Sequence, residues 1–235
     1  MNHVEMMGCI VNHDLRYTPK GLPILETTLA GHTGSIWYQR ITLIGKIAER
    51  MADLPIGDVL YTQGKLQHNR WTTKDGHKRS SVKMLTARTE VIDANLTRVN
   101  DARGQPILQD AIQEVTLAGN VTHDVDVKDT GKAQLAKASI AVNERKQQHG
   151  EWVDDTHFFE LVAWEGTPAF EALRAAGKGS SLVVRGMLHG RSWEGADGRK
   201  RYATDIKSSV VLPIGKLGDA SRLDIDVGGF GDAPF

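Results

Sequence analysis

The chain has 235 residues, of which 40% are apolar and 25% charged, a composition typical of a globular protein. Its 29 basic and 29 acidic residues cancel, which excludes a strongly basic domain, so any binding of a polyanion must depend on where the charges are placed. A single cysteine excludes a disulfide framework, no apolar run approaches the roughly 18 residues of a membrane span, and the N-terminus lacks the pattern of a signal peptide, so we expect a cytoplasmic protein.

The first predicted unit begins with apolar residues that alternate with others, the pattern of a strand. Its helix is indicated by Ile47, Met51 and Leu54, which recur at the spacing of one helical face. The Asp75-Gly76 pair is typical of a turn that reverses the chain between two strands. The expected elements are, in order, strands at 4–10, 25–30 and 37–44, a helix at 47–54, and strands at 59–66 and 81–92.

The second predicted unit follows the same order. Thr167 and Pro168 offer a helix N-cap followed by proline at the first helical position. The expected elements are strands at 115–121, 135–142 and 158–164, a helix from 167 onward, and strands at 182–188 and 203–212. Three strands, a helix and two more strands are the element order of the OB barrel. We therefore predict an all-β protein of two tandem five-stranded OB-fold barrels, each with one short helix between strands 3 and 4.

A repeat in the sequence supports this duplication. Residues 57–79 and 179–201 align without a gap, and nine of the 23 aligned pairs are identical. So long a period indicates duplicated domains and not a solenoid. The expected division is 1–93 for the N-terminal OB fold, 94–113 for a connector that could form a small hairpin, 114–213 for the C-terminal OB fold, and 214–235 for an acidic, flexible, disordered tail.

The repeated segment places a tryptophan and several cations in the hairpin between the fourth and fifth strands. An exposed indole is costly in water, whereas a base stacked on an aromatic ring contributes about 1–3 kcal/mol. We therefore predict that Trp71 and Trp193 stack on bases; the alternative is that each indole folds back onto its own barrel among solvated charges. The cations expected beside them are Arg70, Lys78, Arg79, Arg191, Lys200 and Arg201.

The third strand of each unit carries adjacent aromatic residues. Neighbouring side chains on a strand point to opposite faces, so one of each pair is expected outside and the other in the core. In the first unit Tyr38 is expected to face outward near Arg40, with Trp37 an equally good candidate. In the second unit Phe159 is expected to face outward in place of Phe158.

Other aromatic and basic residues are weaker candidates. Arg16 and Tyr17 lie in the first turn region, where a cation and an aromatic ring could hold a phosphate and a base. The long polar loop after the second strand of the second unit carries Lys146 and Trp152, and we expect it to be a flexible hairpin that wraps a strand. Trp164 is expected in the core of the second unit.

No enzymatic constellation is found in the sequence. Residues 177–180 read Gly-Lys-Gly-Ser but lack the Gly-x-x-x-x-Gly-Lys-Ser/Thr frame of a phosphate-binding loop. The carboxylates show no repeated pairing, and the nine histidines show no metal-ligand spacing. We therefore expect no catalysis, no metal and no cofactor.

In this order, the motifs resemble those of bacterial single-stranded-DNA-binding proteins, most closely the form with two OB domains per chain found in the Deinococcus–Thermus lineage. The resemblance covers both barrels and the tail, and it adds Lys46 to the expected DNA contacts. The matching segments are 2–8, 15–18, 37–46, 114–122, 139–143 and 193–198.

The resemblance implies sequence-independent binding and protection of single-stranded DNA in replication, recombination and repair, in a nucleoid-associated protein. Members work with four OB folds, which implies a homodimer here. The family's base-stacking aromatic positions fall on Trp71, Trp193, Tyr38 and Phe159. Three positions where the family has a further aromatic carry Ile44, Glu165 and, approximately, Lys146.

The last residues resemble the acidic end, terminating in Pro-Phe, by which the family docks replication and repair enzymes. The residues that correspond are Asp224, Asp226, Asp232, Pro234 and Phe235. The acids are sparser and the spacer is shorter than usual in the family, and a merely solubilising end is the alternative. For the whole chain, the alternative function is an OB-fold protein-interaction accessory factor of replication or conjugation.

Overall fold

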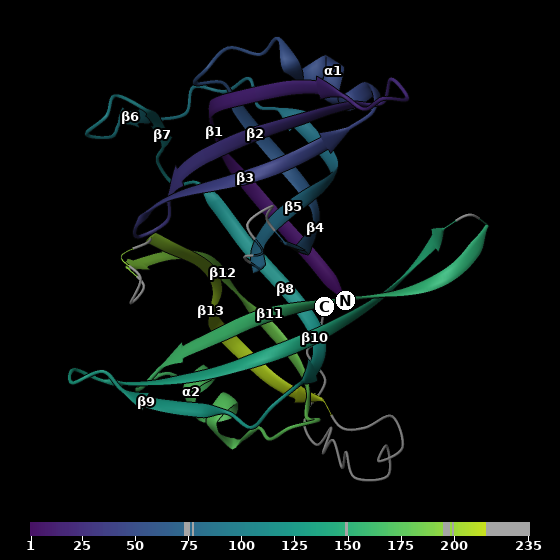
Figure 1. Cartoon of the computed structure of the whole chain (residues 1–235). Coiled ribbons are helices and arrows are strands. Elements are labelled where there is room, and N and C mark those ends of the chain that lie inside the picture. Colours follow the sequence, from purple (N-terminus) through teal and green to yellow (C-terminus); the bar gives the residue numbers. More distant parts are fainter. Residues whose placement is uncertain (73–75, 77, 149, 195–197, 199, 215–235) are drawn as a thin grey trace, which may run out of the picture.

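Two groups of long strands, one from each half of the chain, form two barrels that lie one above the other (Figure 1). The computed structural model describes residues 1–72, 76, 78–148, 150–194, 198 and 200–214. None of the helices in these residues is long and apolar enough to cross a bilayer. The architecture is all-β, as predicted, with one short helix in each half.

The first barrel is closed by its strand pairings. Strand β1 pairs with β2, β2 with β3, β3 in parallel with β5, β5 with β4, and β4 again with β1, so the five strands form a ring. This is the strand order of an OB barrel, with the helix between β3 and β4. The elements are β1 (Asn2–Tyr17), β2 (Pro23–His32), β3 (Ile36–Ile44), α1 (Lys46–Ala52), β4 (Val59–Thr72) and β5 (Lys78–Val91).

The second barrel repeats this ring. Strand β8 pairs with β10, β10 with β11, β11 in parallel with β13, β13 with β12, and β12 with β8. The elements are β8 (Ile112–Val121), β9 (Asp126–Asp129), β10 (Gln134–Gln148), β11 (Glu151–Trp164), α2 (Pro168–Ala175), β12 (Ser181–Glu194) and β13 (Lys200–Ile214). Helix α2 begins as predicted, because the Thr167 hydroxyl accepts a hydrogen bond from the Phe170 N–H and Pro168 occupies the first turn.

The repeated glycines have a steric cause. In each barrel a bulge on the fifth strand lies opposite a glycine of the fourth strand, Gly64 or Gly186, and brings the two backbones close together. A Cβ atom at Gly64 would lie 2.1 Å from the Leu85 carbonyl oxygen, and one at Gly186 would lie 2.3 Å from the Lys207 carbonyl oxygen. Only glycine permits this approach, so the identity of the two halves at this position follows from the fold.

The connector forms a small hairpin attached to the first barrel. Strands β6 (Arg98–Asn100) and β7 (Pro106–Leu108) pair with each other, and β7 adds in parallel to β2 at Gly31 and Leu108. Asp101 starts the turn of this hairpin, since its carboxylate accepts the N–H groups of Arg103 and Gln105, each at 2.8 Å. The connector is therefore part of the sheet in the structure.

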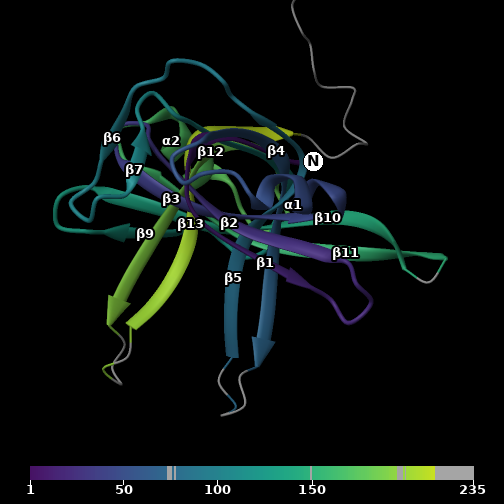
Figure 2. The ribbon, with the colours of Figure 1, turned by 90° about the horizontal axis from the view of Figure 1, so that it is seen from above.

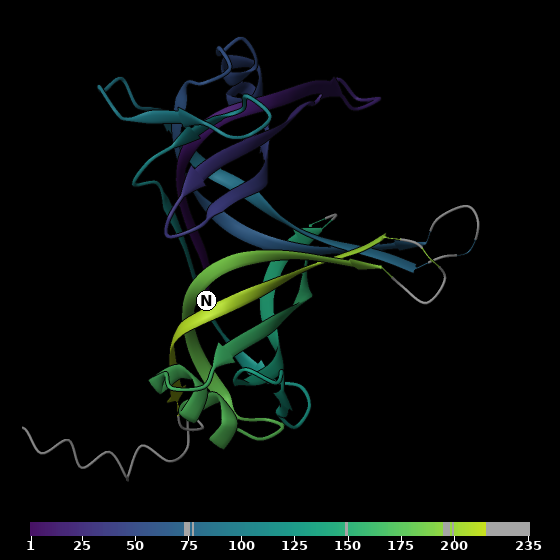
Figure 3. The same cartoon turned by 90° about the vertical axis from the view of Figure 1, so that its left-hand side faces the viewer.

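The two barrels are joined by a continuous sheet, because β1 pairs antiparallel with β8 from Asn2 opposite Leu117 to Met7 opposite Ile112. Beside this ladder, Glu144 of the β10–β11 hairpin accepts hydrogen bonds from Asn2, at 2.7 Å, and from Lys65 of the first barrel. These contacts set the orientation of one barrel against the other. As a result the β4–β5 and β12–β13 hairpins project to the same side of the molecule (Figures 2 and 3).

Candidate nucleic-acid interface

The tips of the two projecting hairpins carry the predicted tryptophans. Trp71 is 48% exposed and Trp193 is 41% exposed, so neither indole is folded into its barrel. The turn glycines Gly76 and Gly198 have positive φ angles of 80° and 70°, as an Asp-Gly turn requires. The side chains of Lys78 and Arg79 lie outside the described residues.

Strand register decides which aromatic of each third strand faces outward. Tyr38 pairs with Ala30 in the first barrel, and Phe158 pairs with Ala141, the corresponding alanine, in the second. Tyr38 is 40% exposed, as predicted, but Phe159 is only 2% exposed. The prediction of an outward Phe159 is therefore wrong, and Phe158 takes the position that Tyr38 has in the first barrel.

The buried neighbours follow from the same alternation. Trp37 is 7% exposed and lies in the core, so it is not a surface candidate. Phe159, Leu161 and Ala163 form the buried face of β11, each at most 2% exposed. Trp164 was expected in the core, but this expectation is wrong: it lies at the end of β11, where it is 38% exposed.

Three adjoining hollows connect the faces of the two barrels, and together we call them the groove. The first hollow, of about 670 Å³, is lined by Tyr38, Arg40, Trp71 and Lys83 of the first barrel and by Tyr202 of the second. A smaller hollow of about 260 Å³ lies at the seam between the barrels, and it shares Tyr202 with the first.

The third hollow extends the groove over the second barrel. It has a volume of about 560 Å³, and it shares Arg70 and Phe158 with the seam hollow. It is also lined by Lys128 and Lys137 of β9 and β10. Since neighbouring hollows share lining residues, the three hollows adjoin one another from the first barrel to the second.

The two ends of the groove differ in charge. At the first-barrel end, Glu26 lies within 4 Å of three cations, Arg16 at 3.1 Å, Lys83 at 3.7 Å and Arg40 at 3.9 Å, so positive charge is in excess. A phosphate can therefore be attracted there without a strongly basic domain.

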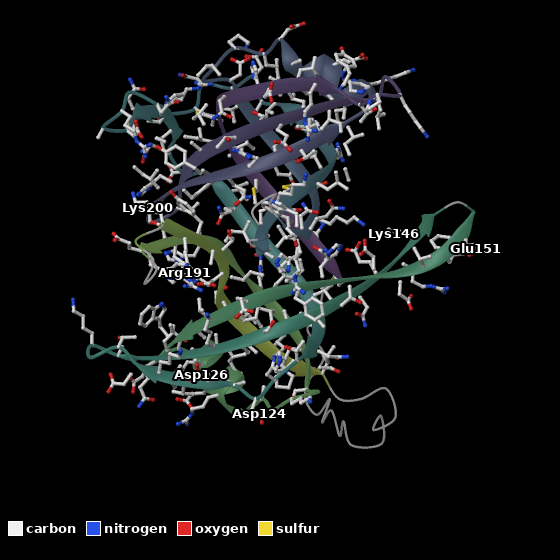
Figure 4. The ribbon with its side chains drawn as sticks, in the orientation of Figure 1. Asp124, Asp126, Lys146, Glu151, Arg191 and Lys200 are labelled. Carbon is white, nitrogen blue, oxygen red and sulfur yellow. The ribbon has the colours of Figure 1, made fainter. Side chains whose placement is uncertain are left out.

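At the second-barrel end the positive charges are balanced. Lys137 lies 3.8 Å from Glu160, and Lys128 lies 3.1 Å from Asp126. Asp124 adds a further acid to this part of the groove, on the lower face where Asp126 also lies (Figure 4). The first barrel is thus the more attractive of the two for a polyanion.

Arginines lie over two aromatic rings of the second barrel, those of Trp193 and Phe158. The Arg191 guanidinium lies 4.6 Å from the centroid of the Trp193 ring, and its Nε donates to the buried Asp205 carboxylate at 2.5 Å. The Arg70 guanidinium, from the first barrel, lies 4.9 Å from the centroid of the Phe158 ring. Such cation–π contacts leave less of each ring open to a base.

Trp193 lies beside the groove and does not line any of its three hollows. Arg191, which covers the Trp193 ring, stands directly opposite Ala203 in the β12–β13 ladder, and Ala203 lines the seam hollow. In the first barrel the positions of Arg191 and Asp205 are taken by Asn69 and Lys83, which cannot form this pair. The two tryptophans are therefore equivalent in sequence but not in surroundings.

Tyr38 is held in place by the connector. Its hydroxyl donates a hydrogen bond to the Asp101 carboxylate at a distance of 2.5 Å. Burial, and then this hydrogen bond, raise the pKa of Tyr38 to about 12, while the same hydrogen bond lowers the pKa of Asp101. The ring of Tyr38 is thereby fixed at the edge of the groove.

The remaining predicted residues lie outside the three hollows. Tyr17 is 57% exposed at the end of β1, and Lys46 is the exposed first residue of α1. Lys146 pairs with Asp155 at 2.7 Å on the β10–β11 hairpin, where Trp152 is 62% exposed. This hairpin projects in a different direction from the other two (Figures 2 and 4).

Two predicted sets lie at or beyond the limits of the described residues. Lys200 and Arg201 begin β13 and are both exposed, and Lys200 lies on the same side of the molecule as Arg191 (Figure 4). The tail residues Asp224, Asp226, Asp232, Pro234 and Phe235 lie outside the described residues.

Sequence reasoning missed Tyr202 and Phe158, which line the groove, and Asp101, which holds Tyr38. Tyr202 is 72% exposed and follows the repeated basic pair directly, which is a signal that could have identified it. Phe158 would have been chosen over Phe159 if the third strands had been aligned so that Tyr38 matches Phe158, an offset of 120 residues, and not Phe159, an offset of 121. Asp101 gives no such signal, because it is 63 residues from Tyr38 in sequence.

The groove offers aromatic rings and cations for contact with a ligand. Among the described residues, no group of three or more His, Cys, Asp or Glu side chains is placed to hold a metal ion. Aromatic rings and cations of both barrels line these adjoining hollows. Such a surface fits a flexible polyanion with flat, unpaired bases.

Comparisons with known proteins agree with this geometry. The single-strand binding protein family matches residues 1–92 and 112–214 of the chain. A single-stranded DNA-binding protein of Thermus aquaticus is 35% identical over 226 residues, which cover 88% of this chain and 82% of that protein. One of Deinococcus radiodurans is 32% identical over 232 residues, covering 92% and 76%. The crystal structure of the wild-type Thermus aquaticus protein superposes with a TM-score of 0.70 and 28% identity, covering 92% of this chain and 94% of that one.

Proposed function

The chain belongs to the single-strand binding protein family, in the form with two OB folds per chain, and from this premise we propose that it binds single-stranded DNA without sequence preference along the groove. Bases stack on the rings of Tyr38, Trp71 and Phe158 in the groove and of Trp193 beside it, and phosphates contact the cations between them. By coating unpaired strands, the protein protects them during replication, recombination and repair.

One observation carries the proposal: aromatic and basic side chains of both barrels line three adjoining hollows. Aromatic stacking tolerates any base, because every base has a π-face, and this gives affinity without sequence readout. The excess of cations near Glu26 supplies the electrostatic part at the first-barrel end.

Titration with oligo-dT tests the proposal directly. Binding should quench tryptophan fluorescence, and the logarithm of the association constant should fall with the logarithm of salt concentration, with a slope of about −0.7 per phosphate neutralised. An unchanged fluorescence together with no retention of labelled oligo-dT at low salt would falsify the proposal.

Further parts of the proposal concern assembly and organisation. We take residues 1–93 and 114–213 as the two OB units and 94–113 as the connector. Two chains would form a homodimer with four OB folds, and the tail from residue 214 onward would recruit replication and repair enzymes. A nucleoid-associated location in the cytoplasm follows from DNA as the ligand.

A protein-interaction accessory factor, the other function considered from the sequence, is not favoured, because the similar proteins are named for binding single-stranded DNA. The expectation of a protein without enzymatic activity agrees with membership of this family.

A further inference from the structure

The β4–β5 and β12–β13 hairpins each place a side chain beside aromatic rings of the other barrel. Tyr202 of β13, in the second barrel, lines the same hollow as Tyr38 and Trp71 of the first. In return, Arg70 of β4, in the first barrel, lies 4.9 Å over the ring of Phe158 of the second. The aromatic rings of each barrel thus have a neighbouring side chain that the other barrel supplies.

These exchanged side chains meet at the seam hollow, which Arg70, Phe158 and Tyr202 all line. At about 260 Å³ this hollow is smaller than the roughly 300–1,000 Å³ of pockets that hold drug-sized ligands, so its size fits a single flat ring. Val82 contributes an apolar wall, and the hydroxyls of Ser80 and Thr204 lie on its lining. The seam hollow adjoins the other two hollows of the groove, because it shares lining residues with each of them.

The exposure of Tyr202 has no explanation in the packing of the barrel. Its side chain is 72% exposed, the largest exposed fraction among the exposed aromatic residues of the described chain. The corresponding position in the first barrel is Ser80, so the fold does not require an aromatic there. An aromatic ring that stands in water at a seam lined by a cation and a second ring fits a stacking role.

The geometry points to the seam hollow as a subsite for one nucleobase, and we propose that this base stacks on Tyr202 while Arg70 moves from the Phe158 ring to hold it from the other barrel. This rests on the proposed binding of single-stranded DNA and adds a site that neither barrel can form alone. A strand would pass from one barrel to the other through this base, so the two OB folds of one chain act as a single binding unit.

The relative placement of the barrels makes such a subsite possible. The β1–β8 ladder and the contacts of Glu144 with Asn2 and Lys65 fix one barrel against the other. A hydrogen bond from the His68 N–H to His157 Nδ1, at 3.4 Å, joins β4 and β11 beside the hollow. The subsite is therefore preformed, and a base entering it does not have to draw the barrels together.

The test is the affinity of full-length variants for an oligo-dT of about 30 nucleotides, long enough to cross two OB folds of roughly 4–16 nucleotides each. Tyr202→Ala should weaken binding by about five- to 150-fold, the range measured for loss of one stacked base. Tyr202→Phe should keep most of the affinity, since the ring remains. Leu212→Ala, an exposed residue on the same strand and outside the groove, is the matched control and should change nothing.

A double-mutant cycle tests whether the two barrels share the base. If Arg70 and Tyr202 hold the same base, the loss in the double alanine variant should fall short of the product of the single losses by a factor of about 2 or more. An oligomer that lacks bases should show no effect of Tyr202→Ala, because only the phosphate contacts remain.

Each outcome has a separate meaning. Wild-type affinity in Tyr202→Ala, or losses that multiply without coupling to Arg70→Ala, would overturn the seam subsite while leaving DNA binding intact. A parent protein that fails to bind oligo-dT would instead remove the proposed function itself. Because Tyr202 is largely exposed, its substitution should leave the melting temperature unchanged, which a thermal melt can verify.

Discussion

Replacing the two repeated tryptophans with alanine should weaken DNA binding unequally, although the sequence repeats them in the same context. Trp71 lines the groove, and none of the described cations lies over its ring. One face of Trp193 is covered by Arg191, which is anchored to the buried Asp205 carboxylate. On Trp193 a base must displace the arginine or stack on the other face, whereas no cation of the described residues has to be displaced from Trp71.

The magnitudes follow from these contacts. Loss of a stacked base costs about 1–3 kcal/mol, so Trp71→Ala should reduce affinity about five- to 150-fold. An arginine over an exposed ring contributes about 0.5–1 kcal/mol. A base that displaces this arginine forfeits that contribution, so its net stacking free energy is smaller by the same amount. Trp193→Ala should therefore cost about two- to fivefold less than Trp71→Ala. In an Arg191→Ala background, most of this difference should disappear, and the loss caused by Trp193→Ala should approach that caused by Trp71→Ala.

The assay is equilibrium binding of labelled oligo-dT at one fixed salt concentration, since affinities at different salt cannot be compared. Trp164→Ala is the control, because Trp164 is 38% exposed but lies outside the groove. An equal or larger loss in Trp193→Ala than in Trp71→Ala would refute the reasoning about the arginine. Unchanged affinity in both variants would show that neither ring stacks on a base.

Three further predictions follow from the packing. Phe158→Ala should weaken DNA binding with little loss of stability, whereas Phe159→Ala should lower stability by about 3–5 kcal/mol because it empties the core; comparing melting curves with binding curves separates them. Asp101→Asn should lower the pKa of Tyr38 from about 12 toward its ordinary value near 10, since the negative charge that disfavours the phenolate is removed, and an ultraviolet titration against Tyr38→Phe measures it; an unshifted titration would exclude the contact. Gly64→Ala should lower the melting temperature, at a cost of about 1–3 kcal/mol, because its Cβ would collide with the carbonyl oxygen of Leu85; wild-type stability would contradict this.

Much of the fold was readable from local patterns. Alternating apolar residues gave the strands, and Thr167 with Pro168 gave the start of α2, because these signals depend only on neighbours in the chain. The gap-free repeat indicated two barrels and marked Trp71 and Trp193 as exposed hairpin residues. The small connector hairpin was left open by the sequence and was decided by its pairing to β2.

The choice between Phe158 and Phe159 could not be made locally. A shift of one residue in strand register exchanges the two faces of a strand, and the residue types on both sides were compatible with either choice. Only the pairing of β11 with β10 and β13 settles that Phe159 packs in the core.

The sequence by itself determined the strand periodicity, the duplication and the aromatic and basic character of the hairpins, since each is written in residues close together along the chain. The tertiary structure alone decided what these residues meet: Tyr38 meets Asp101, Arg191 meets Asp205, and Arg70 meets Phe158 across the seam. The physical reason is that such contacts join residues from 14 to 88 positions apart, and the register of the β1–β8 ladder sets how the barrels face each other.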